Sequence, residues 1–182
     1  MIKRICVFCG SSSGRNHKYA KAAADLGKLL AEHNIELIYG AGKLGLMGKL
    51  SASVMLNSGR VVGVYPKGVF SDDSINRNIT KLMVTGSMHE RKSLMSQMAD
   101  AFIALPGGIG TVEELTEAIT WSQLNIHSKP VGIVNTDGYY DHLLCFLKQS
   151  VKEGFLDDIY LKRLFVADTP RGVLKAVLRG KP

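Results

Sequence analysis

Short apolar runs alternate with longer amphipathic stretches along almost the whole chain. Each apolar run is only a few residues long and is bounded by glycine, proline, asparagine or charged residues, a pattern that favours strands over helices. The runs predict seven strands, at Arg4–Cys9, Ile35–Gly40, Arg60–Pro66, Lys81–Gly86, Ala101–Gly107, Lys129–Asn135 and Leu164–Asp168.

The stretches between these runs carry apolar residues at helical spacing. Asn34 and Asn125 stand where two of the stretches end, and asparagine suits the left-handed residue that follows a helix. Thr169 and Pro170 pair a capping residue with a proline, a typical start for a last helix. The other predicted helices are His17–Asn34, Leu46–Gly59, Ser87–Asp100, Thr111–Asn125 and Tyr139–Gly154.

The alternation of strands and helices predicts an α/β fold: a doubly wound, Rossmann-like parallel sheet with helices on both faces. Several strands are apolar throughout, as in a sheet that is buried on both sides. The chain has 182 residues without repeats or linkers, so we expect a single domain over residues 1–182. The longest polar stretch, Lys67–Asn78, is expected to form a loop or lid. Ligands bind such sheets at the carboxyl ends of the strands, so function is expected in the loops that follow them.

Composition narrows the function classes. The net charge is +7, but lysine and arginine are scattered, which favours a solvated surface and a small anionic ligand over nucleic acid. The apolar runs are too short to span a membrane, and the N-terminal run is interpreted as a strand rather than a signal peptide. Three cysteines form no disulfide pattern, which indicates a reducing, cytoplasmic setting. Cys6 and Cys9 are expected on opposite faces of one strand, not as a redox pair.

Gly40, Gly42 and Gly45 form a literal G-x-G-x-x-G between a predicted strand and a predicted helix. A dinucleotide site also requires an acidic residue about 20 positions further on, and the chain lacks it. The motif also follows the second predicted strand rather than the first. We interpret it as a tight turn beside a ligand, or as close packing of helix on sheet, rather than as an NAD site.

The sequence PGGIGT, at residues 106–111, is the stronger signal. Gly107, Gly108 and Gly110 allow backbone N–H groups to converge without obstruction by Cβ atoms. The helix that follows adds the positive end of its dipole, so the loop suits a monophosphate. No Lys-Ser/Thr follows the glycines, which excludes a triphosphate-binding P-loop, and no Asp-rich metal site is evident. We expect neither a metal nor a cofactor.

Two carboxylates, Glu113 and Glu114, follow this loop directly. Thr111 to Glu114 fits the pattern S/T-x-x-E, in which Glu114 closes a capping box at the start of the helix. Alternatively, a carboxylate beside a phosphate site faces the attached sugar, where it stabilises the positive charge that develops as a glycosidic bond breaks. The pattern leaves both interpretations open.

Cations stand near the start of the predicted helix Ser87–Asp100, where the helix dipole disfavours them. This local conflict indicates a task for Arg91 or Lys92, such as holding an anion or pairing with Glu114. His89 lies beside them and is ambiguous.

Taken together, PGGIGTVEE and the upstream MHERK resemble the Lonely Guy family of cytokinin riboside 5′-monophosphate phosphoribohydrolases. The resemblance extends from CVFCGSS through YGAGKLGLMG to ITWSQLNIHSKPVGIVNTDGYYD, almost the full length. Members were long labelled lysine decarboxylases, yet the chain offers no strong context for a pyridoxal-binding lysine. The resemblance implies hydrolysis of a nucleoside 5′-monophosphate, either an N6-substituted adenylate or AMP, by a cofactor-free homodimer whose site lies near the subunit interface.

The resemblance also implies roles for individual residues. Arg91 and Glu114 are the implied catalytic pair. The implied substrate-binding residues are Met88, Lys92, Gly107, Gly108, Ile109, Gly110, Thr111, Glu113 and Thr120, with the glycines and Thr111 on the phosphate.

Two positions and one stretch depart from the family pattern. Ala41 replaces the middle glycine of YGGG, and Asn125 stands where glycine is common. In Lys67–Thr80, where members often carry a substrate-holding glutamate, the candidates are Asp72 and Asp73. The departure in Lys67–Thr80 bears on base preference more than on reaction type. The competing hypotheses are a nucleotide- or cofactor-binding carrier on the same fold and, from charge alone, a nucleic-acid binder.

Overall fold

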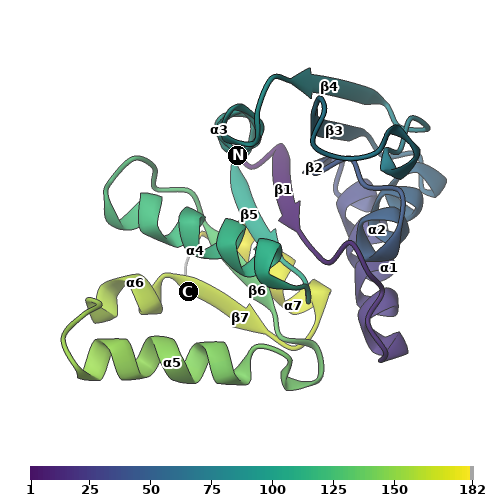
Figure 1. Ribbon diagram of the computed structural model, residues 1–182. Coiled ribbons are helices and arrows are strands. Elements are labelled where there is room, and N and C mark those ends of the chain that lie inside the picture. The colour runs from purple at the N-terminus through teal and green to yellow at the C-terminus, as the bar shows by residue number, and fades with distance from the viewer. Residues whose placement is uncertain (181–182) are drawn as a thin grey trace.

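The computed structural model describes residues 1–180 and contains one seven-stranded sheet (Figure 1). All six neighbouring pairs of strands are parallel, which confirms the doubly wound fold. The spatial order is β4-β3-β2-β1-β5-β6-β7, so the chain winds outward from β1 in one direction and then restarts at β5 on its other side. The strands are β1 Arg4–Phe8, β2 Glu36–Tyr39, β3 Val61–Pro66, β4 Lys81–Thr85, β5 Ala101–Ala104, β6 Val131–Val134 and β7 Leu164–Ala167.

Helices cover both faces of this sheet. On one face lie α1 (His17–Glu32), α2 (Gly45–Leu56) and α7 (Pro170–Arg179), which share a core with one side of the strands. On the other face lie α3 (Met88–Met98), α4 (Ile109–Gln123) and α5 (Asp141–Lys152). In Figure 1, α1 and α2 flank β1 on one side and α4 crosses on the other.

Residue alternation in β1 shows why the sheet needs both layers. Ile5, Val7 and Cys9 point into the core under α1 and α2, whereas Cys6 and Phe8 point into the core under α3 and α4. A strand places successive side chains on opposite faces, and here both faces are apolar. Cys6 and Cys9 are therefore separated by the sheet, as expected, and both are free thiols.

Most helix ends follow the predicted signals. Asn34 and Asn125 adopt left-handed φ values of 54° and 56° after α1 and α4, and Thr169 Oγ1 accepts a hydrogen bond from Gly172 N at the start of α7. The helix α4 departs from prediction, because it begins at Ile109 with Gly108 as its capping residue rather than at Thr111. A short helix, α6 (Asp158–Lys162), was not predicted.

The polar stretch after β3 is a loop, as predicted, with one 3₁₀ turn at Asp72–Ser74. Its second half is fastened to the loop after β2 by backbone hydrogen bonds from Lys43 N to Ser74 O (2.9 Å) and from Asn76 N to Ala41 O (2.8 Å). The Tyr65 hydroxyl donates to Asp72 at 3.2 Å. These contacts hold the stretch over the end of β2.

Candidate active site

The topological switch point between β1 and β5 gathers three loops. Gly10 N donates to Pro106 O at 3.1 Å, which joins the loop after β1 to the glycine loop after β5. Leu46 N at the start of α2 donates to Gly10 O at 3.1 Å. A hollow of about 250 Å³ lies between them, lined among others by Ser11, Gly108 and Tyr139. This is the place where open α/β sheets bind ligands.

The glycine loop opens directly onto the N-terminus of α4. Gly108 is in an extended conformation and no side chain caps the helix, so the N–H groups of the first turn are left without the usual side-chain partner. A Cβ atom on Gly108 or Gly110 would meet open space, whereas one on Gly107 would collide with Thr111 Oγ1 and stand 2.8 Å from Gly10 N. Gly107 is thus required by packing, and the other two glycines leave room for an anion.

The capping-box interpretation of Glu114 is wrong. Thr111 lies inside the first turn and is buried, so it does not cap the helix. The Glu114 carboxylate turns instead towards α3, where its Oε1 lies 3.6 Å from Arg91 Nη2. Both side chains are nearly buried, with 8% of Arg91 and 15% of Glu114 exposed. The structure therefore brings together the pair that the resemblance implied.

Arg91 is held from two other sides. Its Nε donates to the carbonyl of Val64 in β3 at 3.1 Å, and Nη1 lies 3.8 Å from Met88 Sδ. Met88 is thereby placed in the cluster, whereas the neighbouring His89 is exposed. The Nη2 nitrogen has no hydrogen bond to any residue of the described range, which leaves donors for a bound ligand.

Lys92 extends the same contact between α3 and α4. Its Nζ lies 2.5 Å from Glu113 and 2.9 Å from Glu117. Burial works against the charge of Lys92, but the hydrogen bonds that it donates to Glu113 and Glu117 outweigh this effect and raise the pKa of Lys92. Sequence reasoning missed Glu117, although its position one turn after Glu113 puts it on the same helix face.

The surroundings of Glu114 shift the pKa of its carboxyl group. Burial raises its pKa, the charge of Arg91 opposes that shift, and the charge of Glu113 adds to it. A carboxyl group in a cleft whose pKa is raised is a candidate for proton transfer.

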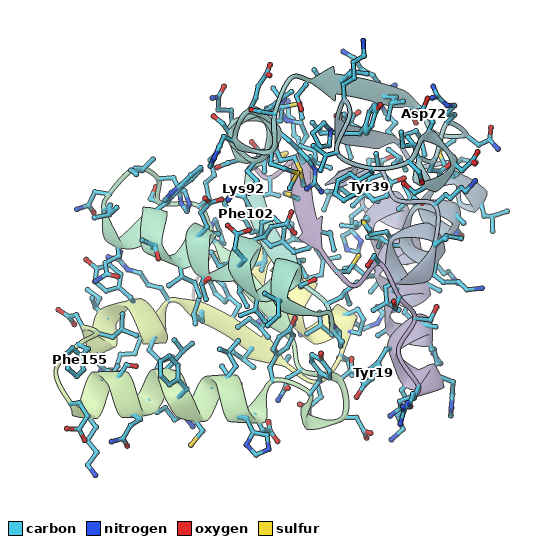
Figure 2. All side chains as sticks on the ribbon, in the orientation of Figure 1. Tyr19, Tyr39, Asp72, Lys92, Phe102 and Phe155 are labelled. Atoms are coloured by element: carbon cyan, nitrogen blue, oxygen red, sulfur yellow. The ribbon has the colours of Figure 1, made fainter. Side chains whose placement is uncertain are left out.

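An apolar recess of about 20 Å³ lies beside Glu114 and Lys92. Phe8 and Phe102, whose stacked rings have centroids 5.7 Å apart, form one wall. Trp121 of α4 is also among the lining residues. Figure 2 shows Lys92 and Phe102 next to each other where α3, α4 and the sheet meet.

Two of the expected substrate residues lie outside this cluster. Ile109 is 86% exposed at the first position of α4. Thr120 is exposed, and its hydroxyl donates to Thr116 O at 2.8 Å. It lies about 9 Å along the helix axis from Glu114. Within one chain, neither residue is brought to the Arg91–Glu114 pair.

Tyr139 is a further residue that sequence reasoning missed. Its hydroxyl donates to Gly107 O at 2.6 Å, and its ring meets Tyr19 edge-on with centroids 5.3 Å apart. The contact spans 32 positions of sequence, so no local pattern indicates it.

In the loop after β2, both the backbone conformation and the close approach of the loop after β1 require glycine at position 45. Gly45 has a φ of 60°, and a Cβ atom there would lie 2.5 Å from Ser12 N. Ala41, the departure from the family pattern, is buried with a φ of 61°. In the loop after β3, Asp72 and Asp73 are both exposed, and Asp72 Oδ2 lies 3.7 Å from Arg77 Nη2.

Within residues 1–180, no three or more His, Cys, Asp or Glu side chains cluster as metal ligands would. That the reaction needs no metal or cofactor stays a prediction. No helix in the same range has both the length and the apolar character needed to cross a membrane.

Comparison with known proteins gives a consistent result. A family model described as "Possible lysine decarboxylase" matches residues 47–177. A probable cytokinin riboside 5′-monophosphate phosphoribohydrolase of Oryza sativa subsp. japonica is 49% identical over 95% of this chain and 70% of its own length. A cytokinin riboside 5′-monophosphate phosphoribohydrolase of Arabidopsis thaliana is 46% identical over 100% of this chain and 83% of its own.

Solved structures agree on the fold. The Moco carrier protein from Chlamydomonas reinhardtii superposes with a TM-score of 0.75 at 23% identity, over 99% of this chain and 98% of that one. The molybdenum cofactor binding protein from Rippkaea orientalis gives 0.73 at 21% identity, over 98% and 97%. At these identities the likeness shows a shared Rossmann-like architecture and nothing about the ligand.

Proposed function

The chain belongs to the LOG family of cytokinin riboside 5′-monophosphate phosphoribohydrolases, and we propose that it hydrolyses the N-glycosidic bond of a nucleoside 5′-monophosphate. The products are the free base and ribose 5-phosphate. The observation that carries the proposal is the buried Arg91–Glu114 pair, which adjoins a glycine loop at a helix N-terminus.

The phosphate binds at the start of α4. Uncapped N–H groups and the positive end of the helix dipole favour an anion there, and Gly108 and Gly110 leave space for it. Thr111 lies in the same turn. Held in this way, the substrate extends its ribose along α4 towards Glu114, one turn further on.

Glu114 acts on the ribose. As the bond between C1′ and the base nitrogen breaks, its electron pair leaves with the base and the sugar becomes an oxocarbenium-like cation. The ionised carboxylate stabilises that cation and accepts a proton from the water whose oxygen bonds to C1′. The same proton then passes to the base nitrogen, which returns Glu114 to its ionised form. The raised pKa of Glu114 makes the carboxylate a stronger base than an exposed glutamate.

Arg91 orients Glu114 and offers its remaining N–H donors to the substrate. The bond from its Nε to Val64 O fixes the guanidinium plane. Lys92, Glu113 and Glu117 join α3 to α4, so the two catalytic side chains keep their relative position.

An N6-substituted adenosine monophosphate is the proposed substrate, with AMP as the second. This choice is supported by the relatives, which are named as cytokinin riboside 5′-monophosphate phosphoribohydrolases. Hydrolysis requires no metal in this scheme, so a chelator is expected to leave turnover unchanged.

We also propose a homodimer with the site near the subunit interface. Thr120 and Ile109 lie on exposed parts of α4, and Leu124 at its end is 63% exposed. A second copy that covers α4 would bring these residues to the neighbouring site. Light scattering measures the mass. Mixing an inactive Glu114 variant with an inactive Thr120 variant is expected to restore partial turnover, because one site of each mixed dimer is then complete.

Two further proposals concern the domain organisation and the cellular compartment of the protein. We propose that residues 1–182 form one domain that unfolds in a single cooperative step, which calorimetry tests. We propose a cytoplasmic location because Cys6, Cys9 and Cys145 are all free thiols, and fractionation of cells tests it.

The deciding experiment incubates the protein with AMP and with N6-isopentenyl-AMP and separates free base by chromatography. Release of base from either nucleotide supports the proposal, and the ratio of the two rates gives the base preference. Nucleotide that stays bound and intact contradicts it and favours a carrier. Binding of duplex DNA with a steep salt dependence would instead indicate a nucleic-acid binder.

A further inference from the structure

Gly40, the first glycine of the G-x-G-x-x-G motif, has no conformational reason to be glycine. Unlike Gly45, it does not have a positive φ. Gly40 is distinguished by the neighbour that fills the space next to its Cα atom. A Cβ atom there would fall onto Arg91 Nη2, with Arg91 Cζ at 3.2 Å and Met47 Sδ at 3.5 Å.

The displaced atom matters because Nη2 is the nitrogen that faces Glu114, 3.6 Å from its Oε1. The guanidinium is planar and rigid, and its Nε is already bonded to Val64 O at 3.1 Å. Nη2 therefore cannot move away from a methyl group at position 40 on its own. The whole plane must tilt, which breaks either the bond to Val64 or the alignment with Glu114.

The surroundings leave little room for adjustment. Only 8% of the Arg91 side chain is exposed. Its other terminal nitrogen lies against Met88 Sδ at 3.8 Å. Close-packed interiors respond to one added carbon by shifting neighbours.

We infer that Gly40 is a positioning residue: the absence of a side chain forms a slot that holds Arg91 Nη2 towards Glu114. The effect on turnover rests on the proposed function, whereas the slot itself does not. The motif that resembles a dinucleotide fingerprint thus serves a catalytic arginine in this chain.

The turnover test compares Gly40→Ala with Gly42→Ala in the same loop. A Cβ atom on Gly42 meets the Cε and Sδ atoms of Met47, the flexible end of a side chain, at 2.5 and 2.9 Å. Gly40→Ala is expected to lower kcat about ten-fold or more, and Gly42→Ala about two-fold or less. Equal losses in both variants would overturn the slot.

A double-mutant cycle distinguishes an effect of Gly40 on the position of Arg91 from a loss of activity that does not depend on Arg91. Lysine has no Nη2, so adding Gly40→Ala to Arg91→Lys is expected to lower kcat by less than about two-fold further. Losses that multiply in the double variant would show that Gly40 acts independently of Arg91 and would overturn the inference. If Gly40→Ala alone does not fold, the double variant is still expected to fold. A double variant that does not fold would contradict the inference that Gly40 makes room for Arg91 Nη2.

One readout needs no turnover. The ¹⁵N resonance of Arg91 Nε, assigned by its loss in Arg91→Lys, is expected to shift in Gly40→Ala and to stay in place in Gly42→Ala. An unchanged resonance in Gly40→Ala overturns the slot whether or not the protein is a hydrolase. A shifted resonance in a protein that releases no base contradicts the proposed function alone.

Discussion

Arg91 of α3 and Glu114 of α4 face each other across the junction of two helices, with Nη2 and Oε1 3.6 Å apart and both side chains nearly buried. The distance is too long for a direct hydrogen bond, so each group retains hydrogen-bonding capacity while feeling the charge of the other. Two opposite charges poised in this way can each engage a ligand placed between them. The charge and burial of this pair determine how substitutions of Glu114 or Arg91 are expected to act.

Glu114→Gln is expected to lower kcat by about 10² to 10⁴-fold, because glutamine keeps the shape of the side chain but can neither accept a proton nor stabilise a cation by charge. The free energy of unfolding is expected to change little at a pH below the ordinary pKa of glutamate, because the carboxyl group is then neutral in both states and glutamine matches its shape. Kinetics and urea unfolding measure both quantities. The control is Glu32→Gln on α1, whose partner Lys28 is 3.8 Å away on the surface. Turnover near the wild-type value in Glu114→Gln would refute the catalytic role.

The pH dependence of turnover reports on the same carboxylate. Burial raises the pKa of Glu114, so the acidic limb of kcat/KM is expected above the ordinary pKa of a glutamate. Arg91 opposes that shift, so Arg91→Gln is expected to move the limb to higher pH. An acidic limb that does not move in Arg91→Gln would separate the titration from this pair.

The raised pKa of Glu114 also makes the free energy of unfolding depend on pH. The folded protein holds the Glu114 proton more tightly than the unfolded chain, so this group lowers stability as pH rises from the unfolded pKa through the folded pKa. Glu114→Gln removes that loss. The stability of the variant relative to wild type is therefore expected to increase over the same pH range and then level off.

Much of the fold is predictable because its signals are local. Period and turn residues identify seven strands, and the asparagines at positions 34 and 125 mark helix ends by a preference of single residues. The helix α6 has five residues, too few for its periodicity to stand out. The order of strands, by contrast, follows from long-range pairing that no short pattern contains.

The candidate site also has some features that local sequence patterns predict and others that depend on tertiary packing. The glycine loop and its helix are one continuous segment, so a glycine loop that opens a helix can be predicted from the sequence. The capping-box interpretation failed because Gly108 starts the helix earlier and a charge on another helix attracts Glu114. The contacts of Lys92 with Glu117 and of Tyr139 with Gly107 depend on tertiary packing.

Tyr139→Phe tests whether the glycine loop needs its outside support. Loss of the 2.6 Å hydrogen bond to Gly107 O is expected to cost about 1 kcal/mol of stability and to raise KM several-fold, because the phosphate cradle loosens. Tyr160→Phe is the matched control, since its hydroxyl donates to Gln123 O at 3.3 Å, at the other end of α4. Equal KM values in the two variants would exclude a role for Tyr139 in holding the loop.

Ala41→Gly restores the glycine that the family pattern favours. Alanine at a φ of 61° is strained by about 1–2 kcal/mol. Glycine relieves that strain but adds about 0.5–1 kcal/mol of unfolded-state entropy and removes a methyl group worth about 0.8 kcal/mol. Because these contributions nearly cancel, the free energy of unfolding is expected to stay within about 1 kcal/mol of wild type, with unchanged kcat. Ala24→Gly inside α1 offers no strain to relieve, so it is expected to cost about 1 kcal/mol. A loss above about 2 kcal/mol in Ala41→Gly would mean that the buried methyl group, not the backbone, decides this position.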